Sequence, residues 1–348
     1  MARRGVVGLD VGTHAVHVAH VTMQRGEPTL VNFGGVALPR GAVREGEVID
    51  VDTVAAAVRQ LWSDAGIRER RVNLGVSNQR VVVRQVDLPH MDEQELRSAL
   101  RFQVQEYIPI PVEEAELDFQ RLDEFTGEGG ARMLRILLVA AHREMIANHV
   151  AVATRAGLRP ASIDLNGFAA LRALVPDPET ARGSEMLVDI GAGVTNILVH
   201  ERGAPRFVRI LVLAGDDITE GLMSTLGLSF EDAEATKHQV GLRGEGDPDA
   251  ARVIEDRAGQ FMDEVRGSLD YYLAQTGAAQ VNRVILSGGG AKLAGLPDRL
   301  TAALRVPVEV GRPLQWLPVR GTVYGPEQLA EVEPVLATAI GLALEGPR

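Results

Sequence analysis

Two carboxylates, far apart in the chain, lie in glycine-bearing turns of the same kind. Asp10 lies in the segment GLDVGT, and Asp189 lies in the segment LVDIGAG. Each turn closes an apolar stretch typical of a buried strand and is followed by a β-branched run typical of another strand. The pattern Arg-Gly-X-Pro follows in both copies, at 25–28 and 202–205, and predicts a hairpin turn. This repeat predicts two similar lobes that offer backbone N–H groups and carboxylates to a nucleotide phosphate and a metal ion.

A third glycine loop, at 288–290, follows another apolar stretch. Glycine permits positive φ and lets backbone N–H groups approach an oxyanion closely. A P-loop is excluded, because neither Lys237 nor Lys292 is preceded by glycine. The Rossmann fingerprint also fails, because Asn196 stands where its third glycine would be. Neither failure excludes a phosphate site shared between two lobes.

The basic residues are unusually uneven. Lysine occurs only at Lys237 and Lys292, and all the other basic residues among the 36 are arginine. The compact lysine ammonium and the planar arginine guanidinium are not equivalent at a tight site. The two lysines are therefore candidates for a specific contact. The alternative is that both lie by chance on solvent-exposed faces.

Composition narrows the class of protein. The chain has 348 residues, 45% of them hydrophobic and 24% charged, which is ordinary for a soluble globular protein of about two domains. A net charge of -11 without a basic run argues against a nucleic-acid surface. The absence of cysteine excludes disulfides and thiolate metal sites. No signal peptide or membrane-spanning stretch is recognised, so we expect a cytoplasmic protein.

The hydrophobic pattern predicts two α/β lobes and an insertion. We expect the first lobe to contain strands at 5–11, 15–22, 29–38 and 72–76 and helices at 52–62 and 168–174. The insertion is expected as a β-α-β-β-α subdomain, with strands at 80–87, 115–123 and 132–140 and helices at 92–106 and 142–156. The second lobe is expected from strands at 186–190, 194–200, 206–213 and 281–286 and helices at 216–226, 230–240 and 248–276.

The resulting division of the chain has five parts. We expect a first lobe at 1–78, an inserted subdomain at 79–160, a connecting helix and hinge at 161–184, a second lobe at 185–331, and an apolar C-terminal connecting helix at 332–348. The polar, proline-bearing stretch at 176–183 is the candidate hinge.

Taken in order, the three loops resemble the two phosphate loops and the adenosine loop of the actin-like ATPase superfamily. The helices at 166–174 and 334–344 resemble its connecting helices, and the insertion resembles the extra subdomain of the division protein FtsA. The segments 98–109, 187–196 and 288–296 are most similar to the PilM family of type IV pilus assembly. The resemblance implies an α/β actin-like ATPase fold of two duplicated, ribonuclease H-like lobes with an FtsA-type β-α-β-β-α insertion.

The resemblance also implies an ATP and Mg²⁺ site. Asp10 and Asp189 would organise the metal, mostly through water. Phosphate contacts are implied for Gly12, Thr13, Gly191, Gly193 and Thr195, with further nucleotide contacts from Ala192, Asn196, Gly215 and Gly288. Glu234 and Lys237 would hold the ribose, and Gly289, Gly290 and Lys292 would flank the adenine. Alone, an Asp-X-Gly turn or a Glu-X-X-Lys helix pair would be ordinary surface structure.

Two departures from the family bear on turnover. His17 stands where the family usually carries a lysine, so one phosphate-facing cation is missing. Asn166 begins the connecting helix and can orient water but cannot accept its proton, whereas Asp164 could do so if it faces the cleft. We therefore expect tight ATP binding with slow or negligible hydrolysis. A metal triad of His14, His17 and His20 is disfavoured, because strand alternation turns His17 away from the other two.

Resemblance to the PilM family implies a groove for the short cytoplasmic tail of the inner-membrane protein PilN. Candidate groove residues are Leu96, Leu100, Phe102, Val104, Tyr107 and Ile108. The alternative is that this helix buries them in its own subdomain. The protein would then be a nucleotide-dependent scaffold, peripheral to the inner membrane through its partner, with self-association possible. An FtsA-like division protein and a small-molecule kinase of the same superfamily remain alternatives. The sequence at 344–348 has no amphipathic helix of the FtsA kind.

Overall fold

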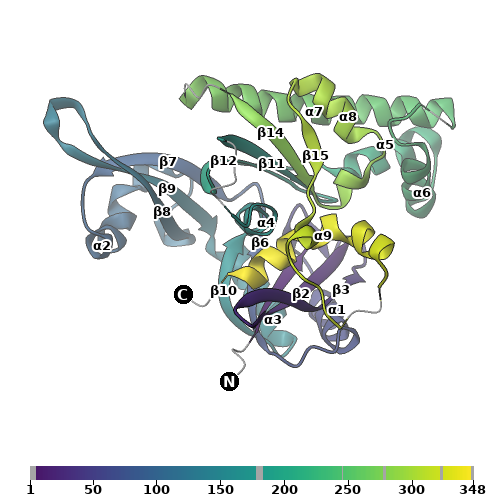
Figure 1. Ribbon diagram of the computed structural model, residues 1–348, viewed down its shortest axis with the longest axis horizontal. Coiled ribbons are helices and arrows are strands. Elements are labelled where there is room, and N and C mark those ends of the chain that lie inside the picture. Colours follow the sequence, from purple (N-terminus) through teal and green to yellow (C-terminus); the bar gives the residue numbers. More distant parts are fainter. Residues whose placement is uncertain (1–4, 178–182, 245, 277–279, 322–323, 346–348) are drawn as a thin grey trace.

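The computed structural model describes residues 5–177, 183–244, 246–276, 280–321 and 324–345. Most of the expected hinge, 176–183, therefore lies outside the described residues. Two five-stranded sheets form the two lobes, and a three-stranded sheet forms a separate arm (Figure 1).

The two lobes have the same sheet topology. In lobe I the strands are β1 (Val6–Val11), β2 (Ala15–Gln24), β3 (Glu27–Ala37), β6 (Arg71–Val76) and β10 (Arg159–Leu165), in the order β10-β6-β1-β2-β3. In lobe II they are β11 (Ser184–Ile190), β12 (Thr195–Glu201), β13 (Ala204–Leu211), β14 (Val281–Ser287) and β15 (Val308–Val310), in the order β13-β12-β11-β14-β15. The first three strands of each lobe are antiparallel and the last two are parallel to the first. The predicted duplication of ribonuclease H-like lobes is confirmed.

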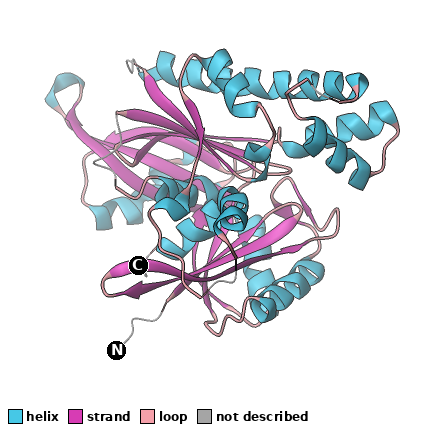
Figure 2. Ribbon diagram, turned by 45° about the vertical axis from the view of Figure 1, so that its right-hand side comes forward, coloured by secondary structure: helices cyan, strands magenta, loops and turns pink. Residues whose placement is uncertain are grey.

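Two helices lie between the sheets and join the lobes (Figures 1 and 2). Helix α4 (Asn166–Leu174) packs Ala170 and Leu171 against lobe II, and helix α9 (Pro326–Leu344) packs its apolar face against lobe I. The helices cross at Gly341, where any Cβ would overlap the carbonyl oxygen of Ala169. Only glycine allows the two helix backbones to approach this closely. Gly341 is therefore required for the observed packing of the connecting helices.

The outer helices cover the remaining sheet faces. Helix α1 (Val51–Asp64) begins at Asp50, whose carboxylate accepts the backbone N–H groups of Asp52 and Thr53 and caps the helix. Lobe II carries α5 (Gly215–Leu226), α6 (Phe230–Val240), α7 (Pro248–Thr276) and α8 (Leu296–Leu304). The long α7 runs across the outside of the lobe II sheet (Figure 1) and buries Ile254 and Val265 in the core of that lobe.

The arm is formed by β7 (Val82–Pro89), helix α2 (Glu93–Gln103), β8 (Ala115–Thr126) and β9 (Arg132–His142), with the strand order β7-β9-β8. The helix α3 (Arg143–Arg155) follows β9 directly, but it does not belong to the arm as we expected. Its buried Val152 and Ala153 lie in the lobe I core with α1. Helix α3 is the crossover between the parallel strands β6 and β10, as α8 is between β14 and β15. We call residues 79–142 the arm from here on.

The remaining elements are short. They are the strands β4 (Val43–Arg44) and β5 (Glu47–Val48) and the 3-10 turns η1 (Gln105–Tyr107), η2 (Val112–Glu114), η3 (Glu128–Gly130), η4 (Gly289–Lys292) and η5 (Pro313–Gln315).

Candidate functional site

The two acidic turns are geometrically equivalent. Asp10 lies opposite His17 in the β1–β2 pair, and Asp189 lies opposite Asn196 in the β11–β12 pair. Each turn is closed by one hydrogen bond, in which the N–H of Gly12 donates to Ala15 O and that of Gly191 donates to Val194 O, each over 2.9 Å. The duplication places a carboxylate at the same point of both lobes, where the lobes face each other.

Both carboxylates line one cavity of about 220 Å³ between the lobes. The pKa of Asp10 is raised from 3.8 to about 7, first by burial and then by the negative charge of Asp189. A 3.1 Å hydrogen bond from Asn166 Nδ2 opposes this rise. Burial also raises the pKa of Asp189, but hydrogen bonds from Ser287 (2.8 Å), Asn196 (3.4 Å) and Thr338 oppose this shift. These three donors favour the ionised form of Asp189, whose charge then disfavours ionisation of Asp10. Such a buried carboxylate pair suits a bound cation.

The cavity contains a histidine that carries no charge at neutral pH. His17 Nδ1 lies 4.0 Å from Asp10 Oδ2, and burial lowers the pKa of His17 to about 4. The side chain at this position is therefore buried and supplies no cation to a phosphate. His14 also lines the cavity, but its Nε2 lies 3.0 Å from Asp216 Oδ2 of lobe II.

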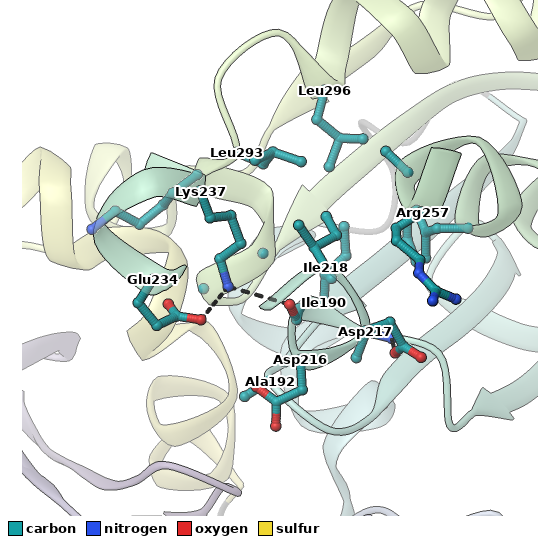
Figure 3. A pocket seen from close by; sticks show the side chains of 18 of the residues that line it. Ile190, Ala192, Asp216, Asp217, Ile218, Glu234, Lys237, Arg257, Leu293 and Leu296 are labelled. Carbon is teal, nitrogen blue, oxygen red and sulfur yellow. Dashed lines mark hydrogen bonds and ion pairs between the residues drawn. The ribbon is translucent and has the colours of Figure 1, made fainter. Parts of the chain in front are cut away.

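A second cavity, of about 240 Å³, adjoins the first and shares Gly191, Ala192 and Gly289 with it. Its walls are mostly apolar, with Ile190, Ile218, Phe261, Leu293 and Leu296 among them. Figure 3 shows Glu234 and Lys237 side by side at its edge. Lys237 Nζ donates to Glu234 Oε1 (2.5 Å), Thr219 Oγ1 (2.8 Å) and Gly215 O (3.2 Å). An apolar slot with a polar edge beside a carboxylate pair suits a nucleoside joined to phosphates.

The third glycine loop closes the space between the two cavities. Gly288 has φ of +81°, and a Cβ there would overlap the carbonyl oxygen of Ile190. A Cβ at Gly290 would overlap the side chain of the same isoleucine. The glycines are therefore required by close packing of this loop against the end of β11.

Several contacts bridge the lobes at the mouth of the site. Ser77 Oγ donates to Asn196 Oδ1 over 2.6 Å. The ring of Phe230 packs edge-on against His14 at 5.2 Å and beneath the guanidinium of Arg40 at 4.4 Å. Apart from Asn196, these bridging residues were not predicted as site residues from the sequence, because each depends on the relative position of the lobes. Ser287 could have been found, since it ends the strand before the third glycine loop.

Most predicted residues line the two cavities. They are Asp10, Gly12, Thr13, Asn166, Asp189, Gly191, Ala192, Asn196, Gly215, Glu234, Lys237, Gly288, Gly289, Gly290 and Lys292. Lys292 lies at the rim, with its Nζ 3.1 Å from Glu331 Oε1.

Three predicted residues do not line either cavity. Thr195 is fully buried, and its hydroxyl donates to Leu213 O over 2.8 Å. Gly193 packs against the side chain of Thr13 on the outer side of the loop. The carboxylate of Asp164 pairs with Arg172 and accepts the N–H of Leu165, so it faces a different groove and cannot serve as a base beside Asp10.

The prediction of a partner groove on α2 is corrected for its buried residues. Leu96, Leu100, Val104 and Ile108 form the core of the arm, as the alternative interpretation held. Phe102 is 84% exposed and Tyr107 is 38% exposed, but neither lines the large groove between the arm and the lobes. A larger groove, of about 860 Å³, runs between the arm and the two lobes. It lies between β8 and β10, which are edge strands of their sheets, and includes Phe119, Phe168 and Pro205.

The duplicated sheets, the crossed connecting helices and the three loops define an actin-like ATPase fold. Two solved structures share it at low identity. The ethanolamine utilization protein EutJ from Carboxydothermus hydrogenoformans is 18% identical, with a TM-score of 0.59 over 99% of this chain and 91% of that chain. MreB5 of Spiroplasma citri bound to ADP is 14% identical, with a TM-score of 0.53 over 97% and 94%.

Within this class, residues 8–347 match the family model of the type IV pilus assembly protein PilM, and the chain belongs to that family. A chain of the PilM-PilN type IV pilus biogenesis complex is 29% identical, with a TM-score of 0.88 over 99% of this chain and 100% of that chain. The cell division protein FtsA of Escherichia coli K12 is 25% identical, in an alignment that covers 98% of this chain and 90% of FtsA. None of the helices in the described part of the chain has the length and apolarity needed to cross a membrane.

Proposed function

We propose that the protein binds magnesium ATP between its lobes and acts as a nucleotide-dependent scaffold that holds the cytoplasmic tail of a PilN-like membrane protein. The observation that carries the nucleotide part is the buried pair Asp10 and Asp189, placed in a cavity that continues into an apolar slot edged by Glu234 and Lys237.

The residues present fit a magnesium nucleotide. Two carboxylates supply oxygen ligands, and the remaining ligands of Mg²⁺ would be water and phosphate. When bound, the cation neutralises the carboxylate pair and the phosphate charge. Asn166 Oδ1 is buried and finds no hydrogen-bond partner among the described residues, so it can accept from a water at the phosphate end. The pair of Glu234 and Lys237 can hold the ribose hydroxyls while the apolar walls hold the base.

The same residues support slow hydrolysis. Asn166 orients a water but cannot take its proton, and Asp164 faces the other groove, where Arg172 neutralises it. The neutral His17 leaves the phosphate end without the lysine that the family usually carries there. Binding energy would therefore stabilise one arrangement of the lobes rather than drive rapid turnover.

The large groove between β8 and β10 is the proposed tail site. The similar chain at 29% identity belongs to a PilM-PilN complex, which supports a PilN-like partner for this chain. Both walls end in the free edge of a sheet, and an extended peptide can add to such an edge through main-chain hydrogen bonds. Phe119 on one wall and Phe168 on the other supply apolar surface for its side chains. Such a tail would hold the protein at the inner membrane.

The test is binding of a fluorescent synthetic peptide with the sequence of the cytoplasmic tail of the PilN-like protein from the same organism. Replacing Phe119 by alanine is expected to weaken binding by about tenfold or more, the value of one buried aromatic contact. Replacing Phe102, an exposed residue of the same type on the same arm, is the matched control and should leave the affinity unchanged. Loss of binding in the Phe102 variant with full binding in the Phe119 variant would contradict the groove.

A further inference from the structure

The arm is joined covalently to lobe I, between β6 and α3, but it also contacts lobe II. The strand β7 contacts β13 of lobe II. One residue of β13, Arg206, contacts both outer strands of the arm. Its carbonyl oxygen accepts from Gln85 Nε2 of β7 over 2.6 Å, and its guanidinium lies 2.5 Å from Asp123 Oδ2 of β8. Oε2 of Glu201, in lobe II, lies 3.1 Å from the Nε of the same guanidinium and forms an ion pair with it.

This contact lies at the end of the large groove. Residues 116–121 of β8, just before Asp123 on the same strand, form one wall of the groove. Gly203 and Pro205, just before Arg206, form its lobe II end. The opposite wall comes from β10 of lobe I and from the connecting helix α4, neither of which belongs to the arm. A shift of Arg206 relative to lobe I therefore pulls β8 toward or away from the opposite wall and changes the width of the groove.

The other end of the same strand is close to the nucleotide cavity. Ile210 of β13 pairs with Asn196 of β12, whose amide donates to Asp189 and accepts from Ser77 of lobe I. Ile210 also packs against the apolar cluster at the base of the arm, which includes Val81 and Ala141. A rotation of lobe II would leave the apolar contact at Ile210 nearly in place. It would move Arg206, farther along β13, by a larger distance and displace its ion-pair partner Asp123.

We propose that Arg206 couples the nucleotide cavity to the tail groove by tying lobe II to β8 through Asp123. When the lobes close on a nucleotide, Arg206 moves with lobe II, and its ion pair with Asp123 moves β8 and changes the width of the groove. The coupling rests on the proposed function, and it is reciprocal, because a tail that selects one groove width must change nucleotide affinity by the same factor. Arg206 is a positioning residue, since it lines neither the nucleotide cavities nor the tail groove.

The first test needs no tail peptide. The chain has no native cysteine, so spin labels can be placed at I49C in lobe I and F102C on the arm, both exposed positions. The distance between the labels is measured by pulsed electron paramagnetic resonance without nucleotide and with a non-hydrolysable ATP analogue and Mg²⁺. The analogue is expected to shift the distance in the otherwise native protein, and Arg206→Ala should remove the shift. The matched control is Arg209→Ala, which breaks an ion pair with Glu264 inside lobe II. An equal shift in the Arg206 variant, or no shift in any of these proteins, overturns the proposal.

The second test uses the tail peptide. In the native chain the analogue should change peptide affinity by about fivefold or more, the lower end of typical coupling between sites. Arg206→Ala and Asp123→Ala should each bring this ratio to within about twofold of one, and the double variant should show no further loss, because both remove the same contact. A ratio that survives in both variants overturns the coupling. A native protein that binds nucleotide but no peptide contradicts the tail site, and the label distances still decide the role of Arg206.

Discussion

Replacing Asp10 by asparagine is expected to stabilise the nucleotide-free protein while weakening its binding of magnesium nucleotide. The Asp10 carboxylate is buried and is repelled by the negative charge of Asp189, and asparagine has nearly the same shape without the charge. The oxygen of the new amide can still accept from Asn166 Nδ2, so the substitution removes charge repulsion and leaves the packing intact. The variant would then bind the cation less tightly, and the nucleotide-free protein would have a higher free energy of unfolding.

The size of the effect follows from the pKa of Asp10. That pKa rises from 3.8 to about 7 on folding. Between these values the folded state holds a proton that the unfolded state has lost, so the carboxylate destabilises the fold by about 1.4 kcal/mol for each pH unit. The penalty is absent below about pH 4 and becomes constant above about pH 7, at on the order of 4 kcal/mol. Asparagine does not titrate, so the stabilisation by Asp10→Asn should follow this curve.

The assay is urea unfolding of the native and variant proteins at several pH values between 5 and 8, without nucleotide, followed by circular dichroism. The difference in the free energy of unfolding should rise by at least about 1 kcal/mol from pH 5 to pH 7.5. Asp256→Asn, at an exposed position on α7, controls for the loss of one surface charge. A difference that stays constant with pH, or a variant less stable than the native protein at pH 8, would refute the electrostatic account of the pair.

Three further predictions concern the fold, the nucleoside end and the tail groove. Gly341→Ala should lower the free energy of unfolding by about 2 kcal/mol or more, because its Cβ overlaps the α4 backbone, while Gly259→Ala, on the open side of α7, should be neutral or stabilising in the same urea titration. Lys237→Ala should weaken ATP binding by about tenfold in calorimetry, and Lys292→Ala, at the rim, by less than about threefold; the reverse order would contradict the ribose assignment. The tail peptide should protect backbone amides of β8 from hydrogen exchange more than those of α2, and protection confined to α2 would contradict strand addition.

The sequence was sufficient to find the two acidic turns. Each depends only on a strand, a short glycine turn and a second strand, which are local patterns, and the repeat located the partner carboxylate. Strand alternation also explains one error. Thr195 and Asn196 are adjacent on β12 and must face opposite sides, so only Asn196 can face the cavity.

Errors elsewhere arose where distant parts of the chain decide the outcome. Asp164 could not be placed from its neighbours, because its partner Arg172 approaches it from the next helix and turns it away from Asp10. The helix α3 follows the arm without a break, so the sequence does not show that its apolar face packs in lobe I. The apolar stripe of α2 fits a partner groove and the core of its own subdomain equally well. Only the three-dimensional packing showed that Leu100 is buried there and Phe102 is not.

The central claim is that Asp10 and Asp189 together hold a magnesium nucleotide between the lobes, and calorimetric titration with ATP tests it most directly. The native protein should bind ATP with micromolar or tighter affinity only when Mg²⁺ is present. Asp189→Ala should weaken binding by about 100-fold, with unchanged circular dichroism and an arm that remains folded. Undiminished, magnesium-independent affinity in a folded Asp189→Ala protein would contradict the claim.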